Sequence, residues 1–228
     1  MAFLTDAAKY YKAEPHQIAA WEALEAELPN DTLEEFKTAY RGSQKPPVAS
    51  GDYIVFTQET FSKLTGYAAN LFTQVEADDC TALFEITGFG YEPELAAMLM
   101  ANILHETANL KYMKEIASGW AYEGRSDLGN TQPGDGPRYK GAGVLQLTGR
   151  YNYDRCSKAL ADPRVMEGVD YVSKTYPFRS AEGWIRDNDL LTVAKTKGFD
   201  AVCYRINGGW NGYEDRKAKY RICRDVLI

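Results

Sequence analysis

The chain has 228 residues, of which 45% are hydrophobic and 25% are charged, values that are ordinary for a soluble globular protein with a proper core. Its formal net charge of −6 argues against nucleic acid as the main partner, because nucleic-acid-binding proteins concentrate lysine and arginine. No segment approaches an apolar membrane span, and the first residues lack the basic start and apolar run of a secretory signal. We therefore expect synthesis in the cytosol, without stable membrane insertion.

Cysteine and histidine usage predicts a protein without a metal. Four cysteines are scattered along the chain without the pairwise spacing of a metal site: Cys80, Cys156, Cys203 and Cys223. They fit free buried thiols better than a disulfide framework. The two histidines, His16 and His105, are too few for a histidine-based zinc site. We expect no metal and no other cofactor.

Residues 1–45 are typical of a helical hairpin. Apolar residues recur at helical spacing over residues 15–28, Pro29 interrupts the pattern, and a second helix is expected over residues 33–40. Residues 46–52 contain two prolines and form a stiffened linker. We predict that residues 53–228 form the main domain. The hairpin is either a small binding module or an appendage packed on that domain.

Helices follow one another from residue 55 onward, and strand signals are sparse. Thr57 can cap a helix that ends at Gly66. Asp78 or Asp79 can cap another helix, which ends at Gly88. The pattern predicts a mainly α fold.

Residues 94–109 are typical of a helix that is apolar on every side except one narrow polar line. Successive helical residues turn through about 100°, so polar side chains spaced by three and four residues share this line. They are Asn102, His105, Glu106 and Asn109. Burying a carboxylate with amides and an imidazole is costly unless they are paired or face a wet pocket. The line therefore indicates a catalytic cleft; the alternative is an internal polar network.

Residues 119–143 form a long segment that is rich in Gly, Asp, Asn and Pro and has no period of its own. Loops of this length inside compact domains are usually functional or disordered. The segment carries Trp120, Tyr122 and Tyr139, which argue against disorder. Sugar rings stack well on such side chains, although aromatic residues also anchor loops that bind no ligand.

Five motifs follow one another along residues 89–209. They are FG at 89–90, HET at 105–107, LGNTQPGDG at 128–136, YKGAGVLQLTGRYNY at 139–153 and RINGG at 205–209. In this order they resemble glycoside hydrolase family 19, the plant-type chitinases and the related phage endolysins. The resemblance covers roughly residues 55–228, and the motif at 128–136 is more similar to the phage enzymes.

The resemblance implies a lysozyme-like helical domain with a deep cleft and long glycine-rich loops. It also implies inverting hydrolysis of a β-1,4 glycosidic bond in an N-acetylated polysaccharide. Matched by position, Glu106 would be the general acid. The residues themselves agree, because the negative end of a helix dipole and partial burial both disfavour the anion of a carboxyl in the last turn.

Two carboxyls are candidates for the general base, Glu115 and Glu123. On one continuous helix Glu115 would lie about 13.5 Å beyond Glu106 along the axis, on the opposite face. Inverting enzymes hold their carboxyls roughly 6.5 to 9.5 Å apart, so the helix must end between the two. Asn109 is the predicted break, because Asn tolerates the left-handed conformation. We favour Glu115 and keep Glu123 as the alternative.

The resemblance also implies the residues that bind water and sugar. Thr148 would position the attacking water. The expected substrate-binding side chains are His105, Tyr122, Gln146, Tyr151, Asn152 and Asn207. One departure is Ala142, because many relatives have Gly-Arg-Gly at residues 141–143, and the missing guanidinium removes a contact near the sugar.

We therefore predict a phage endolysin that hydrolyses the β-1,4 bonds of peptidoglycan. The alternative is a chitinase acting on N-acetylglucosamine polymers. A third possibility is a protein that is not an enzyme, namely a non-catalytic wall-binding or structural lysis protein. Retention of Glu106, Glu115, Thr148 and Asn152 argues against a decayed site. As an endolysin it would act as a monomer and stay in the host cytoplasm until a holin-type pore releases it to the periplasm and cell wall.

Overall fold

The computed structural model describes residues 53–228; the predicted hairpin and linker lie outside the described residues. The described residues form α-helices and short 3₁₀-helices, and within that range the β pairings are the isolated bridges Lys114–Ala142 and Ala142–Leu147. The predicted mainly α fold is confirmed. Over the same residues, no helix has the length and apolar character needed to cross a membrane.

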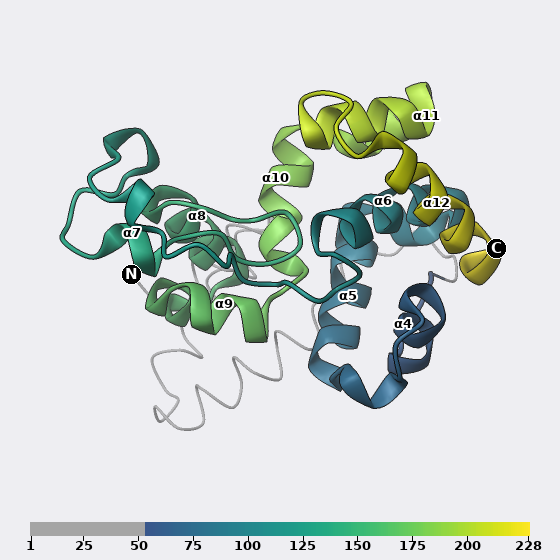
Figure 1. Cartoon of the computed structure of the whole chain (residues 1–228), viewed down its shortest axis with the longest axis horizontal. Coiled ribbons are helices and arrows are strands. Elements are labelled where there is room, and N and C mark those ends of the chain that lie inside the picture. Colours follow the sequence, from purple (N-terminus) through teal and green to yellow (C-terminus); the bar gives the residue numbers. More distant parts are fainter. Residues whose placement is uncertain (1–52) are drawn as a thin grey trace, which may run out of the picture. The chain divides into compact units, whose positions relative to one another are not determined.

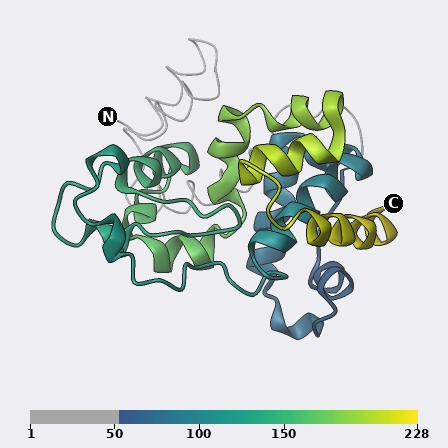
Figure 2. The ribbon, with the colours of Figure 1, turned by 45° about the horizontal axis from the view of Figure 1, so that its top comes forward.

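The helices gather into two groups within residues 53–228. The α-helices are α4 (Gln58–Thr65), α5 (Gln74–Thr87), α6 (Pro93–Glu106), α7 (Asp135–Arg138), α8 (Arg150–Leu160), α9 (Val169–Thr175), α10 (Glu182–Asp187), α11 (Leu190–Asn207) and α12 (Tyr213–Leu227). The 3₁₀-helices are η1 (Ala69–Leu71), η2 (Phe89–Tyr91), η3 (Trp120–Tyr122), η4 (Ser126–Leu128), η5 (Pro163–Glu167) and η6 (Arg179–Ala181). Figures 1 and 2 show α7, α8 and α9 together, apart from α4, α5, α6 and α12.

Caps define the first two helices of this range. Thr57 caps α4 with a reciprocal side-chain bond, and Gly66 ends it in the left-handed conformation, as predicted. Helix α5 begins earlier than predicted, because Thr73 accepts the N–H of Glu76 while the Glu76 carboxylate accepts the N–H of Thr73. This reciprocal pair satisfies two backbone donors at once. Gly88 ends α5 as predicted.

The prediction that Asp78 or Asp79 caps α5 was wrong, because both lie inside the helix. Asp79 has a different function. It is buried, and its Oδ2 accepts the backbone N–H groups of Phe178 at 2.7 Å and Arg179 at 3.0 Å. Burial raises the pKa of the Asp79 carboxyl to about 7, although these backbone bonds and the Arg179 charge act in the opposite direction. Asp79 thus fixes the start of η6 to α5.

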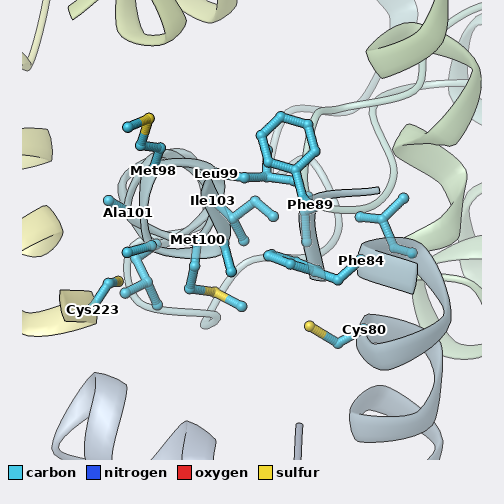
Figure 3. Packing of buried hydrophobic residues seen from close by; sticks show 14 of the residues in the cluster. Cys80, Phe84, Phe89, Met98, Leu99, Met100, Ala101, Ile103 and Cys223 are labelled. Atoms are coloured by element: carbon cyan, nitrogen blue, oxygen red, sulfur yellow. The ribbon is translucent and has the colours of Figure 1, made fainter. Parts of the chain in front are cut away.

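Helix α6 lies at the centre of the larger hydrophobic core. Every residue from Leu95 to Leu104 is buried. Figure 3 shows Phe84 and Phe89 on one side of α6 and Cys223 of α12 on the other. Full burial of one such large apolar side chain stabilises the fold by about 1.5–3 kcal/mol, so the leucines, methionines and isoleucine of α6 contribute substantially to the stability of this core. The four cysteines are free and buried, as predicted.

A second, smaller core lies under the other helix group. Its members come from α8, η5, α9 and the segment before α8: Tyr139, Ala142, Tyr153, Cys156, Leu160, Val165, Val169 and Val172. The rings of Tyr139 and Tyr153 lie 5.1 Å apart. Tyr139 is only 1% exposed, so this aromatic residue of the long segment is a core residue and offers no platform to a sugar.

The chain reverses immediately after α6. The helix ends at Glu106, three residues before the predicted break at Asn109. The residues that follow, Ala108, Asn109 and Leu110, have φ angles of 49°, 62° and 63°. Left-handed geometry costs roughly 1–2 kcal/mol for each residue with a Cβ. The Thr107 hydroxyl offsets part of this cost, because it donates to the Ile103 carbonyl and accepts the Leu110 N–H.

The Asp79→Asn variant tests the buried carboxyl. Because the pKa of Asp79 in the folded protein, about 7, lies above its ordinary value of 3.8, the folded protein binds this proton more tightly than the unfolded chain does. The wild type therefore loses stability as pH rises through that window, and the Asn variant lacks this loss. We expect the melting temperature of the wild type, relative to the variant, to fall between about pH 4 and about pH 7. The control is Asp78→Asn, because Asp78 is exposed. If the difference in melting temperature between the wild type and Asp79→Asn does not vary with pH, the account is contradicted.

Candidate functional site

Glu106 pairs with a buried arginine of α12. Arg216 Nη2 donates to Glu106 Oε1, and Nη1 donates to Asn102 Oδ1 at 2.8 Å. The Arg216 side chain is 1% exposed, whereas that of Glu106 is 28% exposed. A buried guanidinium is costly without such acceptors. The polar line on α6 is therefore partly an internal network, and Glu106 lies at its solvent-accessible end.

Arg216 was not among the site residues predicted from the sequence. Glu106 therefore has an ion-pair partner that the prediction from the helix dipole and partial burial did not include. A sequence signal for Arg216 exists. Arg216 and Cys223 are the buried residues of α12, and their spacing of seven places both on one helical face. An arginine on the buried face of a helix requires an acidic or amide partner.

His105 contacts the beginning of α12. Its Nδ1 shares a hydrogen bond of 2.6 Å with Asp215 Oδ2. A Cβ on Gly212 would lie 2.2 Å from His105 Cε1, so the glycine lets the turn before α12 lie directly on the imidazole. Burial raises the pKa of Asp215, but hydrogen bonds from His105 and Lys219 outweigh it and leave the pKa below its ordinary value. His105 thus supports the helix that carries Arg216; its predicted contact with substrate stays a prediction.

Glu115 lies beyond the chain reversal, beside residues of two loops. Its Oε2 accepts the Gly141 N–H at 2.8 Å, and its Oε1 accepts the Tyr122 hydroxyl at 3.2 Å. Partial burial and the Glu115 charge raise the pKa of Tyr122. A Cβ on Gly141 would lie 2.3 Å from Gln146 Oε1 and 3.1 Å from Glu115 Oε2. The structure thus brings Glu115, Tyr122 and Gln146 together around a glycine.

Successive hydrogen bonds connect Gln146, Thr148 and Asn152. The Thr148 hydroxyl donates to the Gln146 carbonyl at 2.8 Å, and the Asn152 amide donates to the Thr148 carbonyl at 2.8 Å. Gln146 itself has a positive φ of 54° and donates to the Gly143 carbonyl. Since the Thr148 proton is already engaged, its oxygen can accept a hydrogen bond from a water molecule.

Glu123 anchors the long segment. Its two carboxylate oxygens accept the backbone N–H groups of Gly134 at 2.7 Å and Gly136 at 2.8 Å. Both residues lie at the start of α7, so Glu123 satisfies donors that this short helix leaves unpaired. The Glu115 carboxylate accepts one hydrogen bond from the backbone and one from a side chain, whereas both oxygens of Glu123 accept hydrogen bonds from the backbone. This difference favours Glu115 as the base.

The glycine-rich motif at residues 128–136 is fastened to the start of α8. Buried Asn130 accepts the Arg150 N–H at 2.8 Å and donates to the Tyr122 carbonyl at 2.9 Å. Arg150 binds Asp135 through two hydrogen bonds of 2.8 and 2.6 Å, and these bonds lower the pKa of Asp135. The long segment of residues 119–143, which has no period in its sequence, is therefore braced by side chains and contains η3, η4 and α7.

Two further predicted residues lie elsewhere. Tyr151 on α8 is 58% exposed, and the Arg155 guanidinium lies 6.0 Å from its ring centre. Asn207 is the last residue of α11, and its side-chain oxygen accepts the Asn211 N–H at 3.1 Å. Asn207 thus stabilises the turn after α11.

A groove of about 930 Å³ lies beside Glu115. Apolar, lysine and glutamate side chains line it: Tyr67, Leu71, Phe72, Glu76, Leu110, Lys111, Tyr112, Met113, Lys114, Glu115, Ile116, Lys140 and Ser173. Glu106 is held separately, by Arg216 at the end of α6. Over residues 53–228, His, Cys, Asp and Glu side chains form no group of three that could hold a metal ion.

Relatives of known name share parts of this sequence. No family model matches the chain. An endochitinase of Arabidopsis thaliana is 37% identical over 118 residues, which are 51% of this chain and 40% of the relative. A glycosyl hydrolase family 19 domain-containing protein of Haemophilus influenzae is 32% identical over 107 residues, which are 47% of this chain and 52% of the relative. The chain thus spans about half of these relatives or less.

Solved structures share the fold. Chitinase C from Streptomyces griseus superposes with a TM-score of 0.57 at 20% identity, covering 78% of this chain and 95% of that one. Another bacterial family 19 chitinase gives a TM-score of 0.57 at 20% identity and covers 76% and 95%. The helical architecture is therefore that of these chitinases. The named relatives and the ordered motifs make the sequence similar to glycoside hydrolase family 19, and the solved structures share its fold.

Proposed function

We propose that the protein is a glycoside hydrolase that cleaves β-1,4 bonds in polymers of N-acetylglucosamine. One observation carries this proposal: Glu106 and Glu115 stand on separate elements, and each is oriented by its own donors. Relatives named as endochitinases support a chitin-type substrate over peptidoglycan, which the sequence analysis had preferred.

The proposed reaction is a single displacement. Glu106 gives its proton to the glycosidic oxygen as the bond from that oxygen to the anomeric carbon breaks. A water molecule, oriented by Thr148, attacks the anomeric carbon from the opposite face and passes a proton to Glu115. The product sugar therefore has the inverted configuration.

Arg216 acts through Glu106 as a positioning residue in this scheme. Its guanidinium holds Oε1, which leaves Oε2 to carry the proton that is donated. When the proton has left, the adjacent positive charge stabilises the Glu106 carboxylate. Because Arg216 is also bound to Asn102, the acid is tied to the interior of α6 and α12.

Glu106→Gln should abolish turnover. Loss of the general acid typically costs about 10²- to 10⁴-fold in rate. The variant should also be less stable by about 1–3 kcal/mol, because the buried Arg216 loses its charged partner. Initial rates on N-acetylglucosamine hexamer, measured well below the melting temperature, check the first effect.

Glu94→Gln provides the matched control for Glu106→Gln. Glu94 accepts hydrogen bonds from Tyr220 and Arg224, so it also joins α6 to α12 through a carboxylate. We expect this variant to keep near-wild-type rates. Comparable rates for Glu106→Gln and the wild type would show that Glu106 belongs only to the structural network.

Paired variants separate the two candidate bases. Glu115→Gln should lose about 10²-fold or more in rate with little change in melting temperature, because the amide oxygen can still accept a hydrogen bond. Glu123→Gln should instead lower the melting temperature, because one of its two oxygens becomes a donor facing a backbone N–H. Initial rates and thermal melts of both variants provide the measurement. An inactive, fully stable Glu123→Gln with an active Glu115→Gln would reverse the assignment.

Peptidoglycan is the second candidate substrate, and the charge of the groove favours it. Lys111, Lys114 and Lys140 line the groove in a protein whose net charge is −6. A hydrogen bond from Lys114 lowers the pKa of Asp170, and the charges of Lys174 and Lys140 act in the same direction. The lining of the groove also includes Glu76 and Glu115, so three lysines stand beside two carboxylates in it. Chitin is uncharged, whereas the peptide stems of peptidoglycan carry carboxylates. As an endolysin, the protein would also need a holin-type pore to reach the wall.

A double variant, Lys111→Gln with Lys114→Gln, tests this second candidate. If peptide carboxylates bind the groove, its initial rate on purified peptidoglycan should fall severalfold while its rate on the hexamer is unchanged. The effect should shrink in high salt, which screens exposed charges. Lys197→Gln on α11 is the surface control. A wild type that cleaves the hexamer but not peptidoglycan would exclude this candidate.

A further inference from the structure

The turn between α11 and α12 carries an exposed tryptophan at a hollow of about 640 Å³. Trp210 is 58% exposed, although large aromatic side chains usually bury most of their surface. Its neighbours in the lining are polar: Asp200, Gly212, Tyr213, Glu214 and Asp215. This group of residues has no function in the proposed reaction.

The indole of Trp210 is held by two tyrosines. The ring centre of Trp210 lies 5.4 Å from that of Tyr204 and 5.2 Å from that of Tyr213. The planes of the Trp210 and Tyr213 rings are at 90° to each other. The Tyr213 hydroxyl donates to Asp200 Oδ1 at 2.7 Å, and this bond raises the pKa of Tyr213 to about 12. The tyrosine is thus kept as a neutral donor in a fixed position. Bracing of this kind removes the ordering cost that a mobile aromatic residue would incur on binding.

The turn itself is also fixed. Asn207 accepts the Asn211 N–H, and Gly212 lies against the His105 imidazole. Asp215, in the lining of the hollow, shares its hydrogen bond with His105, the residue that precedes Glu106. The hollow therefore adjoins the end of α6 that carries the proposed acid.

The side chains around Trp210 suit a neutral sugar. An indole face stacks on the C–H face of a pyranose ring, as it does on other apolar surfaces with polar edges. Asp200 and Glu214 supply acceptors for hydroxyl and acetamido N–H groups, because ionised carboxylates only accept hydrogen bonds. The same carboxylates would repel an anionic ligand.

We propose that Trp210, Asp200 and Glu214 form a subsite that binds one N-acetylglucosamine unit on the α11–α12 turn. The identity of the polymer rests on the proposed function. Trp210 supplies the stacking surface, Glu214 and Asp200 bind the polar edge, and Asn207 acts indirectly by holding the turn. This subsite extends substrate binding onto the part of the fold that supports Arg216.

Binding to an inactive protein tests the subsite without relying on turnover. In the Glu115→Gln background, we expect Trp210→Ala to weaken binding of N-acetylglucosamine hexamer about 3- to 10-fold in calorimetric titration. Trp210→Phe should retain much of the affinity, and Glu214→Ala should weaken it. Ile222→Ala is the control, because Ile222 is an exposed apolar residue of α12 outside the lining of the hollow.

Tryptophan fluorescence supplies a second readout that does not need the alanine variant. Hexamer should change the emission of the Glu115→Gln protein, and most of that change should vanish in the same protein with Trp210→Phe. Unchanged affinity for Trp210→Ala together with an unchanged fluorescence response for Trp210→Phe would overturn the subsite while leaving the proposed function intact. A wild type that neither binds nor cleaves the hexamer would overturn both.

Discussion

The ion pair between Glu106 and Arg216 is the constraint on which the rest of the site depends. Helix α6 is buried along ten consecutive residues, and apolar contacts alone would allow α12 to pack against it in several registers. A buried guanidinium is stable only where carboxylate and amide acceptors meet it, so Glu106 and Asn102 fix where α12 lies. The interaction that specifies this packing therefore also presents the proposed acid at the end of the helix.

The second constraint is the reversal after α6. Three consecutive left-handed residues with side chains cost free energy, and the Thr107 hydroxyl and the surrounding core must hold them in place. Because of the reversal, Glu115 lies on a segment separate from α6. Gly141 has no Cβ, and this leaves room for the Glu115 carboxylate and the Gln146 side chain. The same carboxylate accepts the Tyr122 hydroxyl. Strain is thus located between the two carboxyls of the proposed reaction, where it changes the direction of the chain.

Local signals in the sequence were reliable, and long-range ones were not. The cap at Thr57, the helix end at Gly88 and the need for a break between Glu106 and Glu115 depend on neighbouring residues, and each is seen in the structure. Asp79 was misassigned because an acidic residue early in a helix resembles a cap, whereas its partners lie about one hundred residues away. The anchoring function of Glu123, the burial of Tyr139 and the pairing of Arg216 likewise depend on distant segments that periodicity does not bring together.

The stereochemistry of the first product tests the central claim most directly. In the proposed reaction a water molecule activated by Glu115 attacks the anomeric carbon, so the reaction is a single displacement and inverts that carbon. Time-resolved proton NMR of the wild type acting on N-acetylglucosamine hexamer should show the α-anomer first, before mutarotation. Initial formation of the β-anomer would show a double displacement, and would contradict the assignment of Glu106 and Glu115 as acid and base of an inverting reaction.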